Sequence, residues 1–252
     1  MKYMGSKSRI AKDIAPILIK YLTEEKSYIE PFLGGANMMC HIKHHKRMGF
    51  DKNNYLIAMW KFLCDGDISV FPTEITKETY SVFRDKFNEA KFNGDGNTFE
   101  EALIGWYGFM GSFNGRFFDG GYSGHNVNGR DYIGEQIRNT LSQVDDLRGV
   151  YFDSADYRDI IIPNNSIVYC DPPYKGTKQY LISKDFCYTQ FWEWCRSETY
   201  KGNDVLVSEY EAPDDFICIW HKEVTNALNT KNTYKPTESL FVHKSIADRY
   251  LY

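Results

Sequence analysis

The spacing of apolar residues along the chain changes several times, and each change marks an expected element. Over residues 7–22 apolar side chains recur at helical spacing, which predicts an amphipathic helix with a kink at Pro16. Strand and helix patterns then alternate, as is typical of parallel βα units. The expected strands are residues 27–32 and a short strand ending at Phe50 and Asp51, and the expected helices are residues 37–46 and 54–63.

The pattern changes after residue 70. Residues 72–104 are charged and look helical, and residues 131–147 also predict a helix. Between them, residues 104–130 contain eight glycines and seven aromatic residues, which is typical of neither a helix nor a strand. We therefore predict that residues 71–148 form a mostly helical module inserted into an α/β core of residues 1–70 and 149–252.

The α/β pattern resumes after the insertion. Residues 167–170 are a continuous apolar run, which predicts a buried strand over residues 166–170. The last two apolar runs are expected to close a mixed sheet as an antiparallel hairpin. The remaining expected elements are strands at 150–152, 204–209, 216–221 and 239–243 and a helix at 186–200.

Charge and composition narrow the class of protein only a little. The net charge is −4, yet the first 20 residues carry five Lys or Arg against one Asp, and local patches matter more than the sum to a phosphate. No apolar stretch is long enough for a membrane span, and the N-terminus does not have the pattern of a signal peptide. The six cysteines show no zinc or disulfide spacing, which predicts reduced thiols, a cytoplasmic protein and no metal site.

Asp171-Pro172-Pro173-Tyr174 is the most informative segment. It follows the buried strand 166–170, at the strand end where open α/β sheets bind ligands. Two prolines remove two N–H donors, so carbonyls and a carboxylate remain to accept hydrogen bonds. Such a turn suits the exocyclic amine of adenine. The alternative is a strand-ending turn with an exposed Asp and a packed Tyr.

The chemistry of that amine explains the pattern. Its lone pair is delocalised into the purine ring, so it is a poor nucleophile. If Asp171 and the Pro172 carbonyl accept both hydrogens, the nitrogen becomes pyramidal and can attack an electrophilic methyl group in line, with orientation lowering the barrier. Tyr174 would stack on the base once it is flipped out of the duplex.

Two further features fit a nucleotide-like cofactor. Glu30-Pro31-Phe32-Leu33-Gly34-Gly35 ends the first strand, where glycines permit close approach of a ligand to the backbone. Asp51 ends the next strand and either accepts hydrogen bonds from ribose hydroxyls or caps the helix that follows. Ser208-Glu209-Tyr210 follows a later strand and either borders the target pocket or packs at the strand end.

Together these segments resemble the Dam-like family of adenine-N6 DNA methyltransferases. Tyr3-Met4-Gly5-Ser6-Lys7 is similar to the N-terminal motif Tyr/Trp-x-Gly-x-Lys, and residues 153–157 resemble the adenosine-contacting segment. The order of the motifs also resembles the family: cofactor motifs, then a recognition insertion, then the catalytic motif. Many relatives have Gly-x-Gly where this chain has adjacent Gly34 and Gly35, which leaves open whether Gly35 or Asn37 lines the cofactor.

The resemblance implies a Rossmann-like class I methyltransferase core that transfers a methyl group from S-adenosylmethionine to a flipped-out adenine in double-stranded DNA. It implies catalytic roles for Asp171, Pro172, Tyr174 and Lys7. It implies cofactor contacts from Tyr3, Lys7, Glu30, Phe32, Gly34, Gly35, Asp51, Asp156, Tyr157 and Asp171.

DNA recognition is expected within the insertion, over residues 111–130. Phe113 is a candidate wedge between base pairs. Arg116 and Arg130 could each read a guanine or bind a phosphate, and we predict that Arg130 reads a base. The alternative is a glycine-rich surface loop whose phenylalanines pack on the helices of the insertion. The candidate DNA-binding residues are Ser112, Phe113, Asn114, Arg116 and Arg130.

Other functions compatible with the pattern are methylation of an amine in RNA or protein, and a nucleic-acid-binding module that has lost catalysis. Asp171 and the long insertion favour DNA adenine over the first, and the intact Lys7, Asp171 and Tyr174 speak against the second. The expected setting is the cytoplasm of a bacterial or phage-infected cell. The protein is expected to be a monomer or weak dimer, with a cognate restriction enzyme as a candidate partner.

Overall fold

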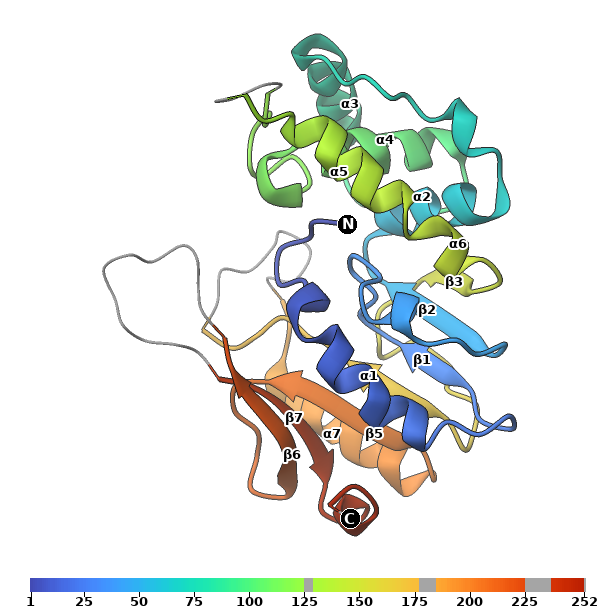
Figure 1. Cartoon of the computed structure of the whole chain (residues 1–252), viewed down its shortest axis with the longest axis vertical. Helices are drawn as coiled ribbons and strands as arrows, with labels where there is room; N and C mark the ends of the chain where they lie inside the picture. Colours follow the sequence, from blue (N-terminus) through green and yellow to red (C-terminus); the bar gives the residue numbers. More distant parts are fainter. Residues whose placement is uncertain (125–128, 177–184, 225–236, 252) are drawn as a thin grey trace.

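The computed structural model describes residues 1–124, 129–176, 185–224 and 237–251. Within them the chain forms one seven-stranded sheet in the order β3-β2-β1-β4-β5-β7-β6 (Figure 1). Five neighbouring strands are parallel, and β7 pairs antiparallel with both β5 and β6. The mixed sheet with its terminal antiparallel pair is therefore confirmed. The strands are β1 Tyr28–Glu30, β2 Arg47–Asp51, β3 Tyr151–Ser154, β4 Ile167–Cys170, β5 Asp204–Glu209, β6 Phe216–Glu223 and β7 Thr237–His243.

Helices cover both faces of the sheet and form a separate layer beyond it. In Figure 1, α1 and α7 lie on opposite sides of the sheet, and α3 to α6 form the upper part of the molecule. The α-helices are α1 Ala11–Lys20, α2 Asn54–Asp65, α3 Lys77–Ala90, α4 Phe99–Gly111, α5 Tyr132–Leu141, α6 Val144–Leu147 and α7 Tyr188–Tyr200. Short 3-10 turns include η1 Lys7–Arg9, η2 Met39–His41, η3 Ile68–Val70, η4 Phe113–Gly115 and η6 Ala247–Arg249.

The central strand β4 shows why the sheet is buried on both sides. All four of its residues are buried, and their side chains alternate between two hydrophobic clusters. Ile167 and Tyr169 belong to the cluster that contains α1 and α2, whereas Val168 and Cys170 belong to the cluster that contains α7. Because successive side chains of a strand point to opposite faces, an unbroken apolar run fits a strand covered on both faces.

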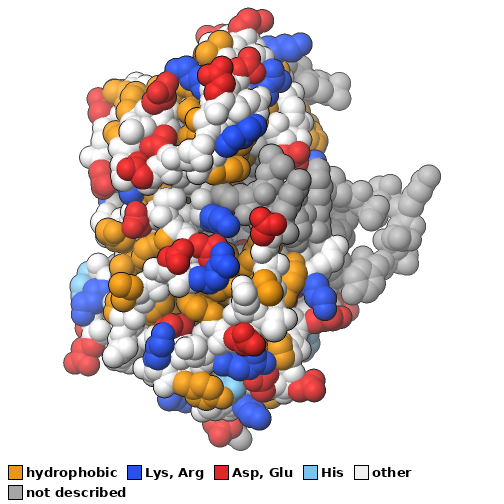
Figure 2. Space-filling model, turned by 180° about the vertical axis from the view of Figure 1, so that it is seen from behind, with side chains coloured by type: hydrophobic (Ala, Val, Ile, Leu, Met, Phe, Trp, Pro, Cys, Tyr) orange, Lys and Arg blue, Asp and Glu red, His pale blue; other side chains and the backbone are white. Residues whose placement is uncertain are grey.

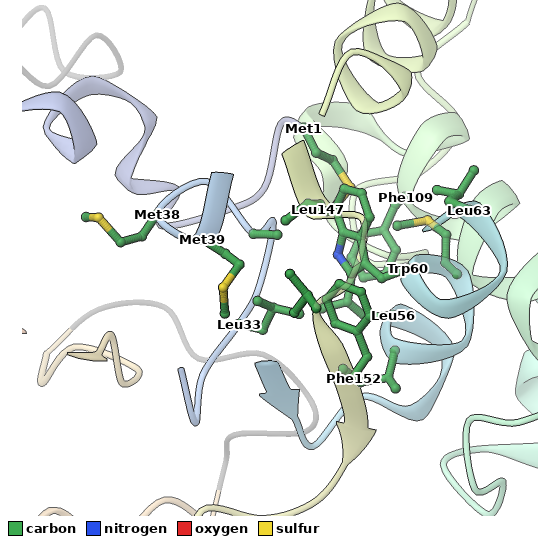
Figure 3. Packing of buried hydrophobic residues seen from close by; sticks show 14 of the residues in the cluster. Met1, Leu33, Met38, Met39, Leu56, Trp60, Leu63, Phe109, Leu147 and Phe152 are labelled. Atoms are coloured by element: carbon green, nitrogen blue, oxygen red, sulfur yellow. The ribbon is translucent and has the colours of Figure 1, made fainter. Parts of the chain in front are cut away.

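Trp60 of α2 joins the sheet to the helical layer. Its side chain is fully buried. Figure 3 shows it among Leu33 of the loop after β1, Phe109 of α4 and Leu147 of α6. The indole nitrogen donates a 3.3 Å hydrogen bond to the carbonyl of Gly34. Removing a side chain of this size from a core costs roughly 3–5 kcal/mol, so Trp60 contributes strongly to the stability of this junction.

The predicted helix over residues 37–46 is wrong. Only the turn η2 is helical, and Ile42 is already extended. The buried guanidinium of Arg47, at the start of β2, donates a 3.0 Å hydrogen bond to the carbonyl of Ile42. The Ile42 carbonyl thus accepts a hydrogen bond from a side chain and not from the backbone N–H of a following helical residue. The buried residues of this segment therefore belong to a packed loop rather than to a helix.

The glycines of residues 104–111 do not mark a loop, because α4 continues to Gly111. They allow the helix to pack closely: a Cβ at Gly105 would lie 2.2 Å from the carbonyl oxygen of Tyr55, and one at Gly108 would lie 2.6 Å from the Phe117 ring. The predicted helix over residues 72–104 is also two helices, since the chain breaks between α3 and α4 at Lys91, whose φ is 53°.

The other boundaries are closer to expectation. The helix predicted over residues 7–22 is the turn η1 followed by α1, and α1 continues through Pro16. The helix predicted over residues 131–147 is divided into α5 and α6. On the side of the molecule seen in Figure 2, basic and acidic side chains are interspersed.

Candidate active site

A cavity of about 340 Å³ lies at the carboxyl ends of the parallel strands. Its walls come from the N-terminal segment, the loops after β1, β2 and β3, and the turn after β4. These segments lie far apart in the sequence and meet because parallel strands end at the same edge of the sheet. The cavity brings together every predicted catalytic and cofactor-binding residue: Tyr3, Lys7, Glu30, Phe32, Gly34, Gly35, Asp51, Asp156, Tyr157, Asp171, Pro172 and Tyr174.

The glycine loop after β1 has no room for side chains. Gly34 has φ +50°, and a Cβ there would lie 2.9 Å from the Tyr3 ring. A Cβ at Gly35 would lie 2.7 Å from Nδ2 of Asn37. Both Gly35 and Asn37 line the cavity, so the loop presents both residues to a ligand.

Asp51 fastens this loop to the end of β2. One carboxylate oxygen accepts a 3.0 Å hydrogen bond from the Gly34 amide, and the other accepts a 2.9 Å bond from the Asn53 amide. The cap of α2 is Asn53, whose side chain accepts hydrogen bonds from the first amides of the helix. The capping interpretation of Asp51 is therefore wrong. Burial raises its pKa, and the two amide hydrogen bonds oppose that effect.

Glu30 is a buried carboxyl group at the end of β1, only 2% exposed. The Tyr28 hydroxyl donates a 2.8 Å hydrogen bond to it. Burial raises the pKa of Glu30 to about 8; the Tyr28 hydrogen bond opposes this effect and the nearby Asp171 adds to it. The group is therefore suited to a ligand that brings hydrogen-bond donors or positive charge.

Asp171 lies at the end of β4, next to the ammonium of Lys7. The Lys7 Nζ is 2.8 Å from Oδ1 of Asp171 and lies 4.2 Å from the centre of the Tyr174 ring. Burial raises the pKa of Asp171 to about 6, with Lys7 lowering it and Glu238 raising it. Among the residues that the structure describes, no hydrogen bond or ion pair engages Oδ2 of Asp171.

Asp156 and Tyr157 follow β3. The Arg158 guanidinium binds the Asp156 carboxylate through two hydrogen bonds of 2.8 and 2.9 Å. Burial alone would raise the pKa of Asp156, but these bonds and the charges of Arg158 and Lys52 lower it. The Tyr157 ring packs on Phe32, 5.5 Å between ring centres, and so forms an apolar wall of the cavity.

The strand end at residues 208–210 is divided between its two interpretations, since Tyr210 lines the cavity whereas Ser208 packs within the sheet. Tyr210 lines the cavity and meets Tyr174 edge to face, 4.7 Å between ring centres. Glu209 is buried, and burial raises its pKa to about 7. Ser208 packs inside the sheet, where its hydroxyl is 2.8 Å from the Tyr169 hydroxyl.

The predicted DNA-binding residues lie outside this cavity. Asn114 and Arg116 line an adjoining open groove of about 620 Å³, which they share with the N-terminal segment. Phe113 is 48% exposed, whereas Ser112 is buried and its hydroxyl accepts a hydrogen bond from the Phe118 amide. Residues 125–128 of the predicted recognition segment lie outside the described residues.

The two predicted arginines differ in their surroundings. Arg116 has a buried Nε without a hydrogen-bond partner among the described residues. Arg130 is exposed and forms a bidentate ion pair with Glu135 through hydrogen bonds of 2.7 and 2.8 Å. Phe117 and Phe118 pack against Phe87 of α3, so the alternative of internal packing holds for these two phenylalanines.

Glu238 is a residue of this site that the sequence did not indicate. It lies near the start of β7, and its carboxylate accepts a 2.8 Å hydrogen bond from the Tyr174 hydroxyl. The apolar pattern predicted this strand only from residue 239. A carboxylate just outside a predicted hairpin strand gives no sign that antiparallel pairing will bring it to the end of β4.

The sheet order and the cavity at the strand ends define a Rossmann-like α/β protein with a nucleotide-type ligand site. The family model described as D12 class N6 adenine-specific DNA methyltransferase matches residues 3–235, and the chain belongs to this family. Among curated proteins, no sequence matches the chain.

One solved structure with a detectable likeness is described as "SMU.472, a putative methyltransferase complexed with SAH". It aligns with a TM-score of 0.38 and 12% sequence identity over 94% of this chain. The chain covers 53% of the length of that protein.

The helices of the described residues are all too short or too polar to cross a membrane. The His, Cys, Asp and Glu side chains of the same residues form no group of three or more that could hold a metal ion.

Proposed function

We propose that the protein methylates the N6 amine of adenine in double-stranded DNA, with S-adenosylmethionine as the methyl donor. The observation that carries the proposal is the position of Asp171. Lys7 holds Oδ1 of its carboxylate at 2.8 Å, and Oδ2 is left to accept a hydrogen bond in the cavity. Membership of the D12 class family supports the reaction.

The acidic and aromatic residues that line the cavity suit the groups of S-adenosylmethionine. The cofactor is positively charged at its sulfonium and amino groups, and the acidic side chains of Glu30, Asp51 and Asp171 line the cavity. Each Asp51 oxygen accepts one backbone hydrogen bond, which leaves further lone pairs for ribose hydroxyls. Phe32 and Tyr157 supply an apolar wall for the adenine ring.

The bound cofactor would supply an electrophilic methyl group. The chain's own residues then orient the acceptor. Asp171 Oδ2 and the Pro172 carbonyl accept the two hydrogens of the target amine, and Tyr174 stacks on its ring. Tyr174 is buried and meets Tyr210 edge to face, so the two rings form an apolar wall beside the acceptor. The ionised form of Asp171 is the one that accepts a hydrogen bond, and Lys7 favours it.

We assign residues 71–148 to DNA recognition, and residues 1–70 and 149–252 to the catalytic core. The groove lined by Asn114 and Arg116 supports this assignment. It adjoins the cavity, and its other wall is the N-terminal segment with Lys2 and Arg9. A duplex placed along this groove would have phosphates near basic groups and a base near Asp171.

The proposed setting is the reducing cytoplasm of a bacterial or phage-infected cell, with which six free thiols among the described residues are compatible. We propose a monomer or weak dimer, with a cognate restriction enzyme as a candidate partner.

Incubation with methyl-labelled S-adenosylmethionine tests the function. Parallel reactions should contain duplex DNA, single-stranded RNA and a protein mixture, followed by identification of the labelled base. We expect N6-methyladenine in the DNA from the wild type and none from Asp171→Ala. Label in RNA or protein alone would replace DNA as the substrate, and no label anywhere would contradict the activity.

A further inference from the structure

Glu238 lies against two residues of the proposed catalytic site. Its Oε2 accepts the 2.8 Å hydrogen bond of the Tyr174 hydroxyl and lies 3.7 Å from the Lys7 ammonium. The side chain is only 14% exposed, so the carboxylate is largely shielded from water. None of the chemistry proposed for the methyl transfer uses it.

The contacts of Glu238 close a ring of three side chains with Lys7 and Tyr174, and Asp171 is joined to this ring through Lys7. Asp171 binds Lys7, Lys7 approaches Glu238, Glu238 binds the Tyr174 hydroxyl, and the Lys7 ammonium lies over the Tyr174 ring at 4.2 Å. The four residues come from η1, the turn after β4, and β7. A ring made from separate segments of the fold holds each member more firmly than a single contact does, because hydrogen bonds in a network reinforce one another.

Tyr174 is restrained at several points by this arrangement. Glu238 binds its hydroxyl, Lys7 lies over its ring, and Tyr210 meets it edge to face at an angle of 81°. The phenol therefore has one orientation at the cavity. A ring that stacks on a flipped base has to be held in this way, since freedom of the ring would be lost on binding.

We propose that Glu238 is a positioning residue for methyl transfer, which fixes the Tyr174 ring and the Lys7 ammonium beside Asp171. The inference rests on the proposed function. Glu238 acts through these two residues. Its position at the start of β7 gives the antiparallel part of the sheet a role in the site.

The charge of Glu238 has a second consequence. Lys7 is shared between Asp171 and Glu238, and the negative charge of Glu238 acts to raise the pKa of Asp171. The activity should fall as the pH drops through the pKa of Asp171, because a protonated carboxyl accepts less well. The other titratable groups in this surrounding are Glu30 on β1, Tyr169 on β4, Tyr174 after β4, and Glu209 on β5.

Two substitutions separate the reach of the side chain from its charge. Glu238→Asp keeps the charge but withdraws the carboxylate from Tyr174, so kcat should fall roughly tenfold, the scale of a lost hydrogen bond to a charged group. Glu238→Gln keeps an oxygen for the Tyr174 hydroxyl but removes the charge. The acid limb of its kcat–pH profile should therefore move to lower pH.

Tyr174→Phe tests whether the effect passes through the hydroxyl. In this background Glu238→Asp should cost much less than in the wild type, because the hydrogen bond is already absent. Glu223→Gln on β6 is the matched control. It removes an exposed carboxylate of the same strand pair and should leave kcat and its pH profile unchanged.

Wild-type methylation of duplex DNA has to be measured first. An inactive wild type contradicts the proposed function itself. An active wild type with a Glu238→Asp variant whose kcat stays within twofold would contradict only the role of Glu238. An unshifted acid limb in Glu238→Gln, or an undiminished loss in the Tyr174→Phe background, also overturns it. A single cooperative melting transition above the assay temperature in every variant separates positioning from misfolding.

Discussion

The carboxyl edge of the sheet and the loop of residues 112–124, between α4 and α5, organise their side chains differently. At the sheet edge, the position of Asp51 or Asp171 follows from the end of a strand paired in fixed register with its neighbours. In the loop, the backbone is held by its own bonds, such as the 2.9 Å bond from the Phe113 amide to the Gly121 carbonyl. Because strand register is fixed, the position of a residue in the sequence predicts where it lies at the sheet edge. The position of a residue in a loop does not predict its location in this way.

The conformation of the loop adds to this difference. Asn114, Phe117 and Phe118 all have positive φ, at 55°, 37° and 62°. Such conformations cost a non-glycine residue on the order of 1–3 kcal/mol and persist only where the surroundings fix them. Here Phe117 and Phe118 turn into the insertion and Phe113 is left exposed. These backbone conformations direct the rings of Phe117 and Phe118 into the protein interior, while Phe113 faces solvent.

The largest expected effect breaks the site at the sheet edge. Asp171→Ala should abolish methyl transfer, a loss of at least roughly 10²–10⁴-fold, the range of a positioned proton-handling side chain. Asp171→Asn should keep some activity because its amide oxygen still accepts a hydrogen bond. Melting temperature and labelled methyl transfer are the measurements. A folded Ala variant with a rate near that of the wild type would show that the assignment is wrong.

The next effect tests whether Asp51 serves the ligand as well as the loop. Asp51→Ala should weaken S-adenosylhomocysteine binding about tenfold or more, since a charge-assisted hydrogen bond is worth roughly 1.5–3 kcal/mol. DNA binding should change less. Calorimetric titration measures both.

Asn53→Ala is the control for Asp51. It removes the cap of α2, which should cost about 1 kcal/mol of stability. It leaves the Asp51 carboxylate in place, so the affinity for S-adenosylhomocysteine should stay near the wild-type value. Equal losses of affinity in both variants would mean that Asp51 acts only through the loop.

The insertion is tested by its two arginines. We predict that Arg130→Ala costs roughly 1–3 kcal/mol and relaxes specificity at one base pair, while Arg116→Ala weakens all sequences alike and flattens the salt dependence. To contact a guanine, the Arg130 guanidinium first has to break its ion pair with Glu135. Methylation rates on duplexes with single substitutions decide, and a uniform loss in Arg130→Ala would refute base reading.

The last expected effect concerns stability rather than activity, and is a pH dependence that arises at the sheet edge. The pKa of Glu30 is 4.5 without perturbation and about 8 in the fold, so the folded state binds more protons between these values. The stability that this group contributes should therefore be fully present below pH 4.5 and be lost as the pH rises through about 8. Thermal melting without cofactor measures it, and Glu30→Gln should flatten the slope. An unchanged slope would place the dependence on other groups, such as Glu209.

Much of the site could be predicted because its residues lie at strand ends. The segments around Glu30, Asp51 and Asp171 were placed correctly, since an apolar run ending in a polar or glycine segment indicates a strand and its end. The glycines of α4 misled for a physical reason. Gly105 and Gly108 serve contact between helices, and only the partners Tyr55 and Phe117 reveal that need.

The sequence by itself determined the mixed sheet and the strand-end residues such as Glu30, Asp51 and Asp171, because local periodicity and strand-end chemistry are properties of short segments. The other predicted cavity residues were implied by the resemblance to the family. Only the tertiary structure decided that Asn53 rather than Asp51 caps α2, that Arg130 pairs with Glu135, and that Glu238 reaches Tyr174. These are contacts whose geometry depends on strand register and loop conformation. A carboxylate in the sequence does not show which partner the fold will bring to it.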